Sequence, residues 1–208
     1  LEKLLAPPYD VISEKYHKDL LNRHPQNVVR AVLKDPADGG LGYEKMGETL
    51  ARWRTDGTLV QDNEPAVFLL EQRFAWEGGN FVRTGLLARF KVEPEGSPAI
   101  RPHEKTRGPA KEDRFSALKA TRANFSPIFF FFEDEGAFAT AVAEAKAAHS
   151  VLRTYRDDEG VDHTMWAITG RIHVEALAKS AGDGPSYIAD GHHRYATAQR
   201  YLNEVGPE

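Results

Sequence analysis

The chain has 208 residues, of which 41% are hydrophobic and 28% charged, so it can bury one substantial core or two small ones. It has no cysteine, which excludes disulfides, thiolate nucleophiles and cysteine-bound metals. The net charge of −4 argues against a general nucleic-acid-binding protein, and no apolar run approaches the ~20 residues that cross a bilayer. We therefore expect a cytoplasmic protein. Because it starts at Leu1 without a methionine or a leader, we interpret it as part of a longer chain.

The first third of the chain predicts helices and one strand. A helix follows the capping residue Ser13 and ends near His24, before Pro25. The apolar run 28–33 is typical of a buried strand, and a second helix is predicted from about Tyr43 to Arg54.

The middle and end of the chain add strands. Segments 66–74 and 81–90 flank Gly78-Gly79-Asn80, the pattern of a long antiparallel hairpin. Further elements are predicted in this order: a helix over 112–122, a phenylalanine-rich core strand after Pro127, a helix over 135–149, strands near 151–155 and 163–168, a helix over 171–181, a strand over 186–189 and a terminal helix. The pattern predicts an α+β fold with a mixed β-sheet and flanking helices, as a single domain over residues 1–208.

The junction between the last strand and the last helix is the most informative motif. Asp190-Gly191-His192-His193-Arg194 turns directly from an apolar strand into a helix. The first amides of such a helix point outward and are reinforced by the positive end of the dipole, which predicts a phosphate site over Asp190 to Arg194 with Arg194 as a further donor. Gly191 is expected to let the backbone approach the phosphate, and His192 or His193 to donate a hydrogen bond to a developing charge, with His192 as a catalytic residue. The alternative is a helix capped by Asp190 with surface histidines. Adjacent helical residues point about 100° apart, so the two histidines are not expected to share a metal.

A second group of charged residues lies in the segment from Arg101 to Arg122, which has seven Lys and Arg residues against three acids, a local charge of +4. A basic segment in an acidic chain suits a small anion. Within its first loop we expect Lys105, Thr106 and Arg107 to bind phosphate. We expect His103 and Glu104 to be catalytic, Glu104 as a base or as a magnesium ligand. The alternative is a solvated charged loop.

Three further sites stay open at this point. Arg30 lies in the apolar run 28–33 and needs either an internal partner or a ligand phosphate. Asp10 either caps the chain locally or reaches the site. Lys111, Asp113 and Arg114 either contact the ligand or support the start of a helix.

Five segments together resemble the family known as domain of unknown function 1015. They are Ala6-Pro7-Pro8-Tyr9-Asp10-Val11-Ile12-Ser13, Arg101-Pro102-His103-Glu104-Lys105-Thr106, Gly108-Pro109-Ala110-Lys111-Glu112-Asp113-Arg114, Ser126-Pro127-Ile128-Phe129 and Ala189-Asp190-Gly191-His192-His193-Arg194-Tyr195. The resemblance extends over nearly the whole chain but implies no established activity.

The junction at Asp190-Gly191-His192 is also similar to the phosphate corner of a wider superfamily. That superfamily holds the N-terminal domain of ParB partition proteins, sulfiredoxin and a free-serine kinase. The resemblance implies a ParB/sulfiredoxin-like core, with residues 60–170 as a large insertion. Sulfiredoxin activity is excluded because His192 stands where the cysteine is needed.

Two function classes follow. The first is a small-molecule phosphotransferase that uses ADP or ATP, with CTP as an alternative, and magnesium as a second possible cofactor. The second is a non-catalytic nucleotide-sensing or partner-binding module of the ParB type. A DNA nuclease is disfavoured by the negative charge. We expect a small-molecule substrate and no membrane or nucleic-acid partner; the oligomeric state is undetermined.

Overall fold

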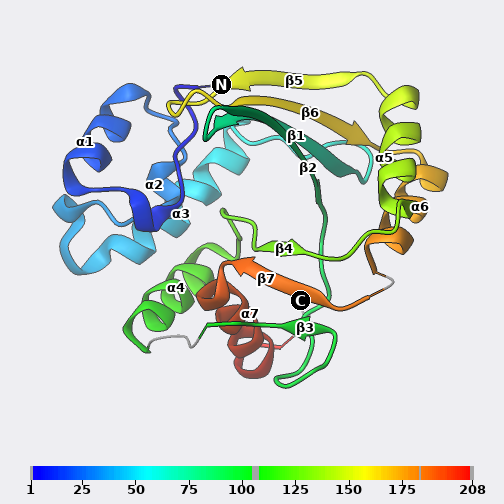
Figure 1. Cartoon of the computed structure of the whole chain (residues 1–208). Coiled ribbons are helices and arrows are strands. Elements are labelled where there is room, and N and C mark those ends of the chain that lie inside the picture. The colour runs from blue at the N-terminus through cyan, green and yellow to red at the C-terminus, as the bar shows by residue number, and fades with distance from the viewer. Residues whose placement is uncertain (1, 105–107, 183, 207–208) are drawn as a thin grey trace. The chain divides into compact units, whose positions relative to one another are not determined.

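The computed structural model describes residues 2–104, 108–182 and 184–206 (Figure 1). The chain divides into two compact units. Unit 1 comprises residues 1–61, 103–129 and 190–208, and unit 2 comprises 62–102 and 130–189. The insertion predicted over 60–170 therefore corresponds to unit 2 only in part, because 103–129 belongs to unit 1. The single-domain interpretation stays a prediction.

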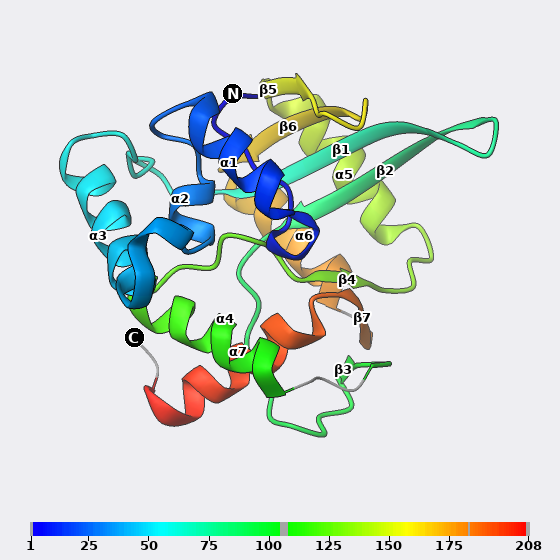
Figure 2. The same ribbon diagram turned by 90° about the vertical axis from the view of Figure 1, so that its left-hand side faces the viewer.

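Unit 1 is built from helices. Its elements are η1 (Tyr9–Val11), α1 (Glu14–Arg23), α2 (Val29–Val32), η2 (Pro36–Leu41), α3 (Gly42–Thr55), α4 (Gly108–Thr121) and α7 (His192–Glu204). The predicted cap of α1 is confirmed, since the hydroxyl of Ser13 accepts the amide of Tyr16 at 3.2 Å. Helix α4 packs against both α3 and α7, and Figure 2 shows α4 and α7 side by side. A small core of Ala31, Leu50 and Trp53 lies among these helices.

The strand predicted over 28–33 is wrong. This segment forms the short helix α2, in which Val29 and Ala31 are completely buried. The buried side chain of Asn27 accepts the amide of Val29 at 3.0 Å and donates to the carbonyls of Lys3 and Leu5, both at 2.9 Å. Tertiary contacts of Asn27 thus override the strand preference of a valine-rich run.

Unit 2 holds a four-stranded antiparallel sheet in the order β2-β1-β6-β5. Its strands are β1 (Val67–Trp76), β2 (Gly79–Leu87), β5 (Val151–Arg156) and β6 (Asp162–Ile168). The hairpin of β1 and β2 is confirmed, with Trp76 opposite Gly79, and its turn lies at Glu77 and Gly78. Both turn residues have positive φ, +46° and +80°, which matches the right-handed twist of the strands.

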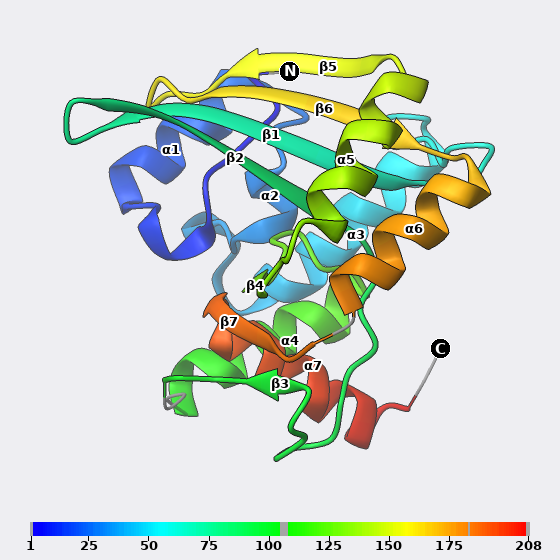
Figure 3. The same ribbon diagram turned by 45° about the vertical axis from the view of Figure 1, so that its right-hand side comes forward.

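Two helices cover one face of this sheet. They are α5 (Ala137–Ala148) and α6 (Arg171–Gly182), which pack against each other and against the sheet (Figure 3). The core of unit 2 lies between them and the strands. Its buried members are Leu69, Phe138, Ala141, Val142, Ala145, Trp166, Ile168 and Leu177.

A second sheet has three strands in the order β3-β7-β4. These are β3 (Ile100–Arg101), β7 (Ser186–Asp190) and β4 (Phe129–Phe131), with β3 parallel to β7. The α+β class is confirmed, although the strands form two sheets where one mixed sheet was predicted. No helix in the described ranges is both long and apolar enough to cross a lipid bilayer.

Candidate active site

The start of α7 has the geometry that the sequence predicted. Strand β7 ends at Asp190, Gly191 takes φ +95°, and the helix begins at His192. A side chain at position 191 would be strained by this backbone angle, and its Cβ would lie 3.1 Å from the guanidinium carbon of Arg194. The N-cap residue of α7 is Gly191, and in the described part of the chain it makes no side-chain cap hydrogen bond. Its N-terminal end therefore keeps the polarity that favours an anion.

Arg194 is held by the protein itself. Its Nη2 donates to Oδ2 of Asp190 and its Nη1 to the carbonyl of Pro127, both at 2.5 Å. The guanidinium is 13% exposed, whereas the carboxylate of Asp190 is 61% exposed. Asp190 thus pairs with Arg194 and does not cap the helix, so the alternative of an Asp190 cap is wrong.

His192 is the most enclosed of the predicted catalytic residues, with its side chain 3% exposed. Its Nε2 accepts the backbone amide of His103 at 3.3 Å, which assigns the ring proton to Nδ1. Nδ1 faces Oε2 of Glu104 at 3.6 Å. Burial lowers the pKa of His192, and Glu104 only partly opposes this effect. The imidazole is therefore a neutral donor directed at a carboxylate.

His103 and Glu104 complete this cluster. The imidazole ring of His103 lies edge-on to that of His192, with 4.5 Å between the ring centres, and its Nε2 is 3.8 Å from Oε1 of Glu104. Both side chains are well exposed, 59% for His103 and 60% for Glu104. A half-exposed carboxylate beside a buried neutral imidazole is an arrangement that can accept a proton from a bound hydroxyl.

The other predicted phosphate ligands have different outcomes. Lys105, Thr106 and Arg107 lie outside the described residues. His193 occupies the first turn of α7, where its backbone carbonyl accepts the hydroxyl of Thr197 at 2.7 Å.

Arg30 lies in α2, and its Nη2 donates to the carbonyl of Leu21 at 2.6 Å, while its Nε is buried without a hydrogen-bond partner in the structure as described. Its internal partner is thus a carbonyl and not a carboxylate. A phosphate role for Arg30 stays a prediction.

A metal site is not preformed in the parts of the chain that the structure describes, since they hold no group of three His, Asp or Glu side chains placed to bind one ion. Glu104 has one carboxylate near two imidazoles. Magnesium normally takes one or two protein carboxylates together with substrate phosphates and water. Glu104 therefore fits that ion only as one ligand beside a bound nucleotide.

A second polar cluster in unit 1 was not assigned from the sequence. The guanidinium of Arg114 stacks on the ring of Tyr9 at 3.9 Å and donates through Nε and Nη2 to Oδ2 of Asp113, at 2.9 and 2.5 Å. The hydroxyl of Tyr43 donates to Asp113 at 2.6 Å and accepts from Lys34 at 3.0 Å. The sequence left open whether Asp113 and Arg114 contact a ligand or support the start of a helix. In the structure they form a tertiary network with Tyr9, Tyr43 and Lys34, so they do more than support the helix start.

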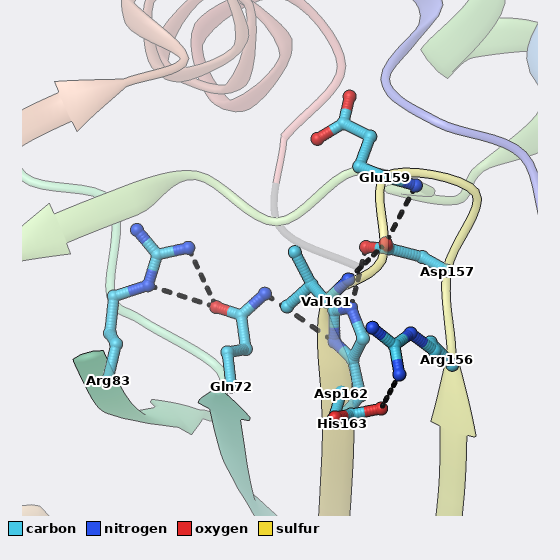
Figure 4. Close-up of polar contacts among 8 residues, drawn as sticks. All are labelled: Gln72, Arg83, Arg156, Asp157, Glu159, Val161, Asp162 and His163. Atoms are coloured by element: carbon cyan, nitrogen blue, oxygen red, sulfur yellow. Dashed lines mark hydrogen bonds and ion pairs between the residues drawn. The ribbon is translucent and has the colours of Figure 1, made fainter. Parts of the chain in front are cut away.

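A third polar network lies in unit 2 (Figure 4). Arg83 donates to Gln72, Gln72 approaches Nδ1 of His163 at 3.5 Å, and Nε2 of His163 is 2.8 Å from Asp157. Asp157 also accepts the amides of Glu159 and Val161 within the turn from β5 to β6. Because these polar groups satisfy one another, the network holds the turn against the sheet.

Comparison with known proteins yields one family. A family model described as "Protein of unknown function (DUF1015)" matches residues 1–208. The chain belongs to the DUF1015 family. No curated protein and no solved structure matches it. The similarity to the ParB and sulfiredoxin superfamily stays a prediction.

In this DUF1015 protein, all five sequence segments that carried the resemblance contribute residues to unit 1. Tyr9, Glu104, Arg114, Pro127 and His192 come from these segments, and each takes part in one of the two clusters described above. The second cluster could have been suspected from the sequence, because Tyr9 and Arg114 both lie in segments that carried the family resemblance. Local periodicity could not have done so, because their contact joins residues that lie far apart in the chain.

Proposed function

We propose that this protein is a nucleotide-dependent phosphotransferase that acts on a hydroxyl group of a small molecule. One observation carries the proposal. Glu104 and His192, 88 positions apart in the sequence, approach to 3.6 Å at the uncapped first turn of α7. Phosphoryl transfer depends mainly on positioning the reactants and neutralising their charge. A helix start that binds an anion and a carboxylate that accepts a proton would together meet these requirements.

The start of α7 is assigned the phosphates of the donor nucleotide. Gly191 lets the backbone approach a phosphoryl group without a Cβ in the way. Asp190 holds Arg194 beside this turn at 2.5 Å, so the guanidinium is preorganised and needs no rearrangement when an anion binds. ADP, ATP and CTP all present the same diphosphate chemistry to such a site.

Glu104 is assigned the role of general base. In the transfer, the oxygen of the acceptor hydroxyl forms a bond to the terminal phosphorus while the bridging P–O bond of the nucleotide breaks. The acceptor proton passes to the carboxylate of Glu104, and the shortened nucleotide leaves with the bridging oxygen. The Nδ1 of neutral His192 lies 3.6 Å from Oε2 of Glu104 and so faces the carboxylate that would accept the proton. Magnesium, when bound with the nucleotide, would neutralise phosphate charge. A carboxylate that held the ion would not also accept the proton, so the roles of base and magnesium ligand are alternatives for Glu104.

Incubation of the protein with ATP, ADP or CTP, magnesium and a panel of hydroxyl-bearing metabolites tests this assignment. Glu104→Gln should lower turnover by about 100-fold or more and leave nucleotide affinity nearly unchanged, because general bases contribute about 10²–10⁴ in rate. Glu175→Gln is the matched control, since Glu175 is an equally exposed glutamate, 63% accessible, on α6.

Two results would contradict the proposal. Full turnover in Glu104→Gln would remove that residue from the mechanism. Binding of a nucleotide with no consumption across the panel would favour the second function, a nucleotide-sensing module.

A further inference from the structure

A small cavity lies inside unit 1, with a volume of about 50 Å³. Its walls are mainly apolar and include Val32, Met46 and Ala117. Two arginines, Arg114 and Arg194, line the same cavity. Apolar walls with a few convergent polar groups are typical of small-molecule sites.

Both arginines have more N–H groups than their hydrogen bonds to described residues use. A guanidinium has five N–H groups in a fixed plane. Among the described residues, Arg114 uses Nε and Nη2 for Asp113 and Nη1 for the carbonyl of Val32, whereas Arg194 uses only Nη1 and Nη2. Each group therefore has N–H donors beyond its internal hydrogen bonds. Two such planar donors on one cavity favour an anion with two equivalent oxygens.

The charge of the surrounding ion pairs selects the anion. Arg114 is paired with Asp113, Arg194 with Asp190, and Lys34 lies 3.4 Å from Asp113. Burial raises the pKa of Asp113, but hydrogen bonds from Tyr43 and Arg114 outweigh it, so the pKa stays below its ordinary value and the group is ionised. Each arginine that lines the cavity is thus already paired with a carboxylate, and the charge of Asp10 acts on Tyr9, which lines the cavity as well. With so little excess positive charge, a monoanion fits the cavity better than a phosphate dianion.

We propose that this cavity binds a short-chain monocarboxylate, with its two oxygens on Arg114 and Arg194 and its alkyl part against Val32, Met46 and Ala117. The volume of about 50 Å³ accommodates a group of this size, since a water needs about 10–15 Å³ on the same measure. This site shares Arg194 with the proposed phosphate site but does not use Glu104 or His192, and the proposal goes beyond the phosphotransferase assignment without resting on it.

Titration of the ¹⁵N-labelled protein with propionate, at ionic strength held constant with chloride, tests the site. The Nε–Hε signals of Arg114 and Arg194 should shift saturably, and the uncharged isostere propionamide should not shift them. In Arg114→Gln and in the cavity-filling variant Ala117→Val, the propionate affinity should fall at least tenfold. Arg153→Gln, which removes an exposed arginine of unit 2, is the matched control and should bind as the unmodified protein does.

Three results would overturn the assignment: equal shifts with propionamide, inorganic phosphate shifting the Nε–Hε signal of Arg114 with an affinity at least equal to that of propionate, or unchanged affinity in a folded Ala117→Val variant. Circular dichroism establishes that each variant is folded. Glu104→Gln separates this proposal from the previous one. It should lower phosphoryl transfer by about 100-fold or more and leave propionate binding intact, so loss of either property can be measured without the other.

Discussion

Substitution of Gly191 by alanine tests the geometry at the start of α7. Gly191 has φ +95°, and an added Cβ would lie 3.1 Å from Cζ and Nε of Arg194 and 3.2 Å from its Nη2. The guanidinium cannot simply move away, because it is fixed by Asp190 and by the carbonyl of Pro127. The variant therefore combines backbone strain with displacement of a hydrogen-bonded group.

The expected magnitude follows from these two contributions. A left-handed conformation costs an L-residue about 1–2 kcal/mol, and the lower freedom of the unfolded chain offsets about 0.4–1 kcal/mol of this. Displacing Arg194 adds about 1 kcal/mol, because hydrogen bonds of charged groups contribute roughly 1.5–3 kcal/mol and are only partly lost. The pair with Asp190 is discounted, since that carboxylate is 61% exposed. We expect a loss of about 2 kcal/mol in the free energy of unfolding.

Urea unfolding of four variants separates the two contributions. Gly57→Ala is the matched control, because Gly57 also lies in unit 1, has φ +77° and has no atom within 4 Å of an added Cβ. It should lose about 1 kcal/mol, from strain alone. In a background of Arg194→Ala, the effect of Gly191→Ala should fall to that of the control, as the clash is then absent. Equal losses at Gly191 and Gly57 in the native background would refute this reasoning.

Three further predictions concern other contacts. Gly47→Ala should destabilise the protein by about 1–3 kcal/mol, because the added Cβ would lie 2.5 Å from the carbonyl oxygen of Ala120. The clash should outweigh the better helix-forming tendency of alanine. A variant that is more stable in urea unfolding would contradict this contact. Lys146→Met should lose about 1–2 kcal/mol at pH 7, since Lys146 is 2.6 Å from Glu71 and its hydrogen bond holds the pKa of that carboxyl below the ordinary 4.5. This stabilisation is present above pH 4.5 and is lost as pH falls below it, so the variant and the unmodified protein should converge in acid, and a constant difference would argue against an ionic origin. Burial lowers the pKa of His17 from 6.5, so the unfolded state takes up the proton first and the free energy of unfolding should fall as pH drops below that value. His17→Gln should reduce the slope of the unfolding free energy against pH between pH 7.5 and 5.5. An unchanged slope would exclude His17 as its source.

The sequence by itself determined the elements whose signals are local. Ser13 marked the start of α1, alternation around Gly78 marked the hairpin, and Asp190-Gly191 marked the turn into α7. Each of these depends on residues within a few positions of one another, since caps, strand periodicity and tight turns are short-range physics.

Only the tertiary structure decided which distant groups meet. The valine-rich run at 28–33 became a helix because the buried side chain of Asn27 binds both its first amide and the N-terminal segment. The contact of Glu104 with His192 and the stacking of Arg114 on Tyr9 join residues about 90 to 105 positions apart. Side-chain type and spacing show that such groups are present, but the free energy that brings them together comes from the burial of the whole helical unit, which no short segment contains.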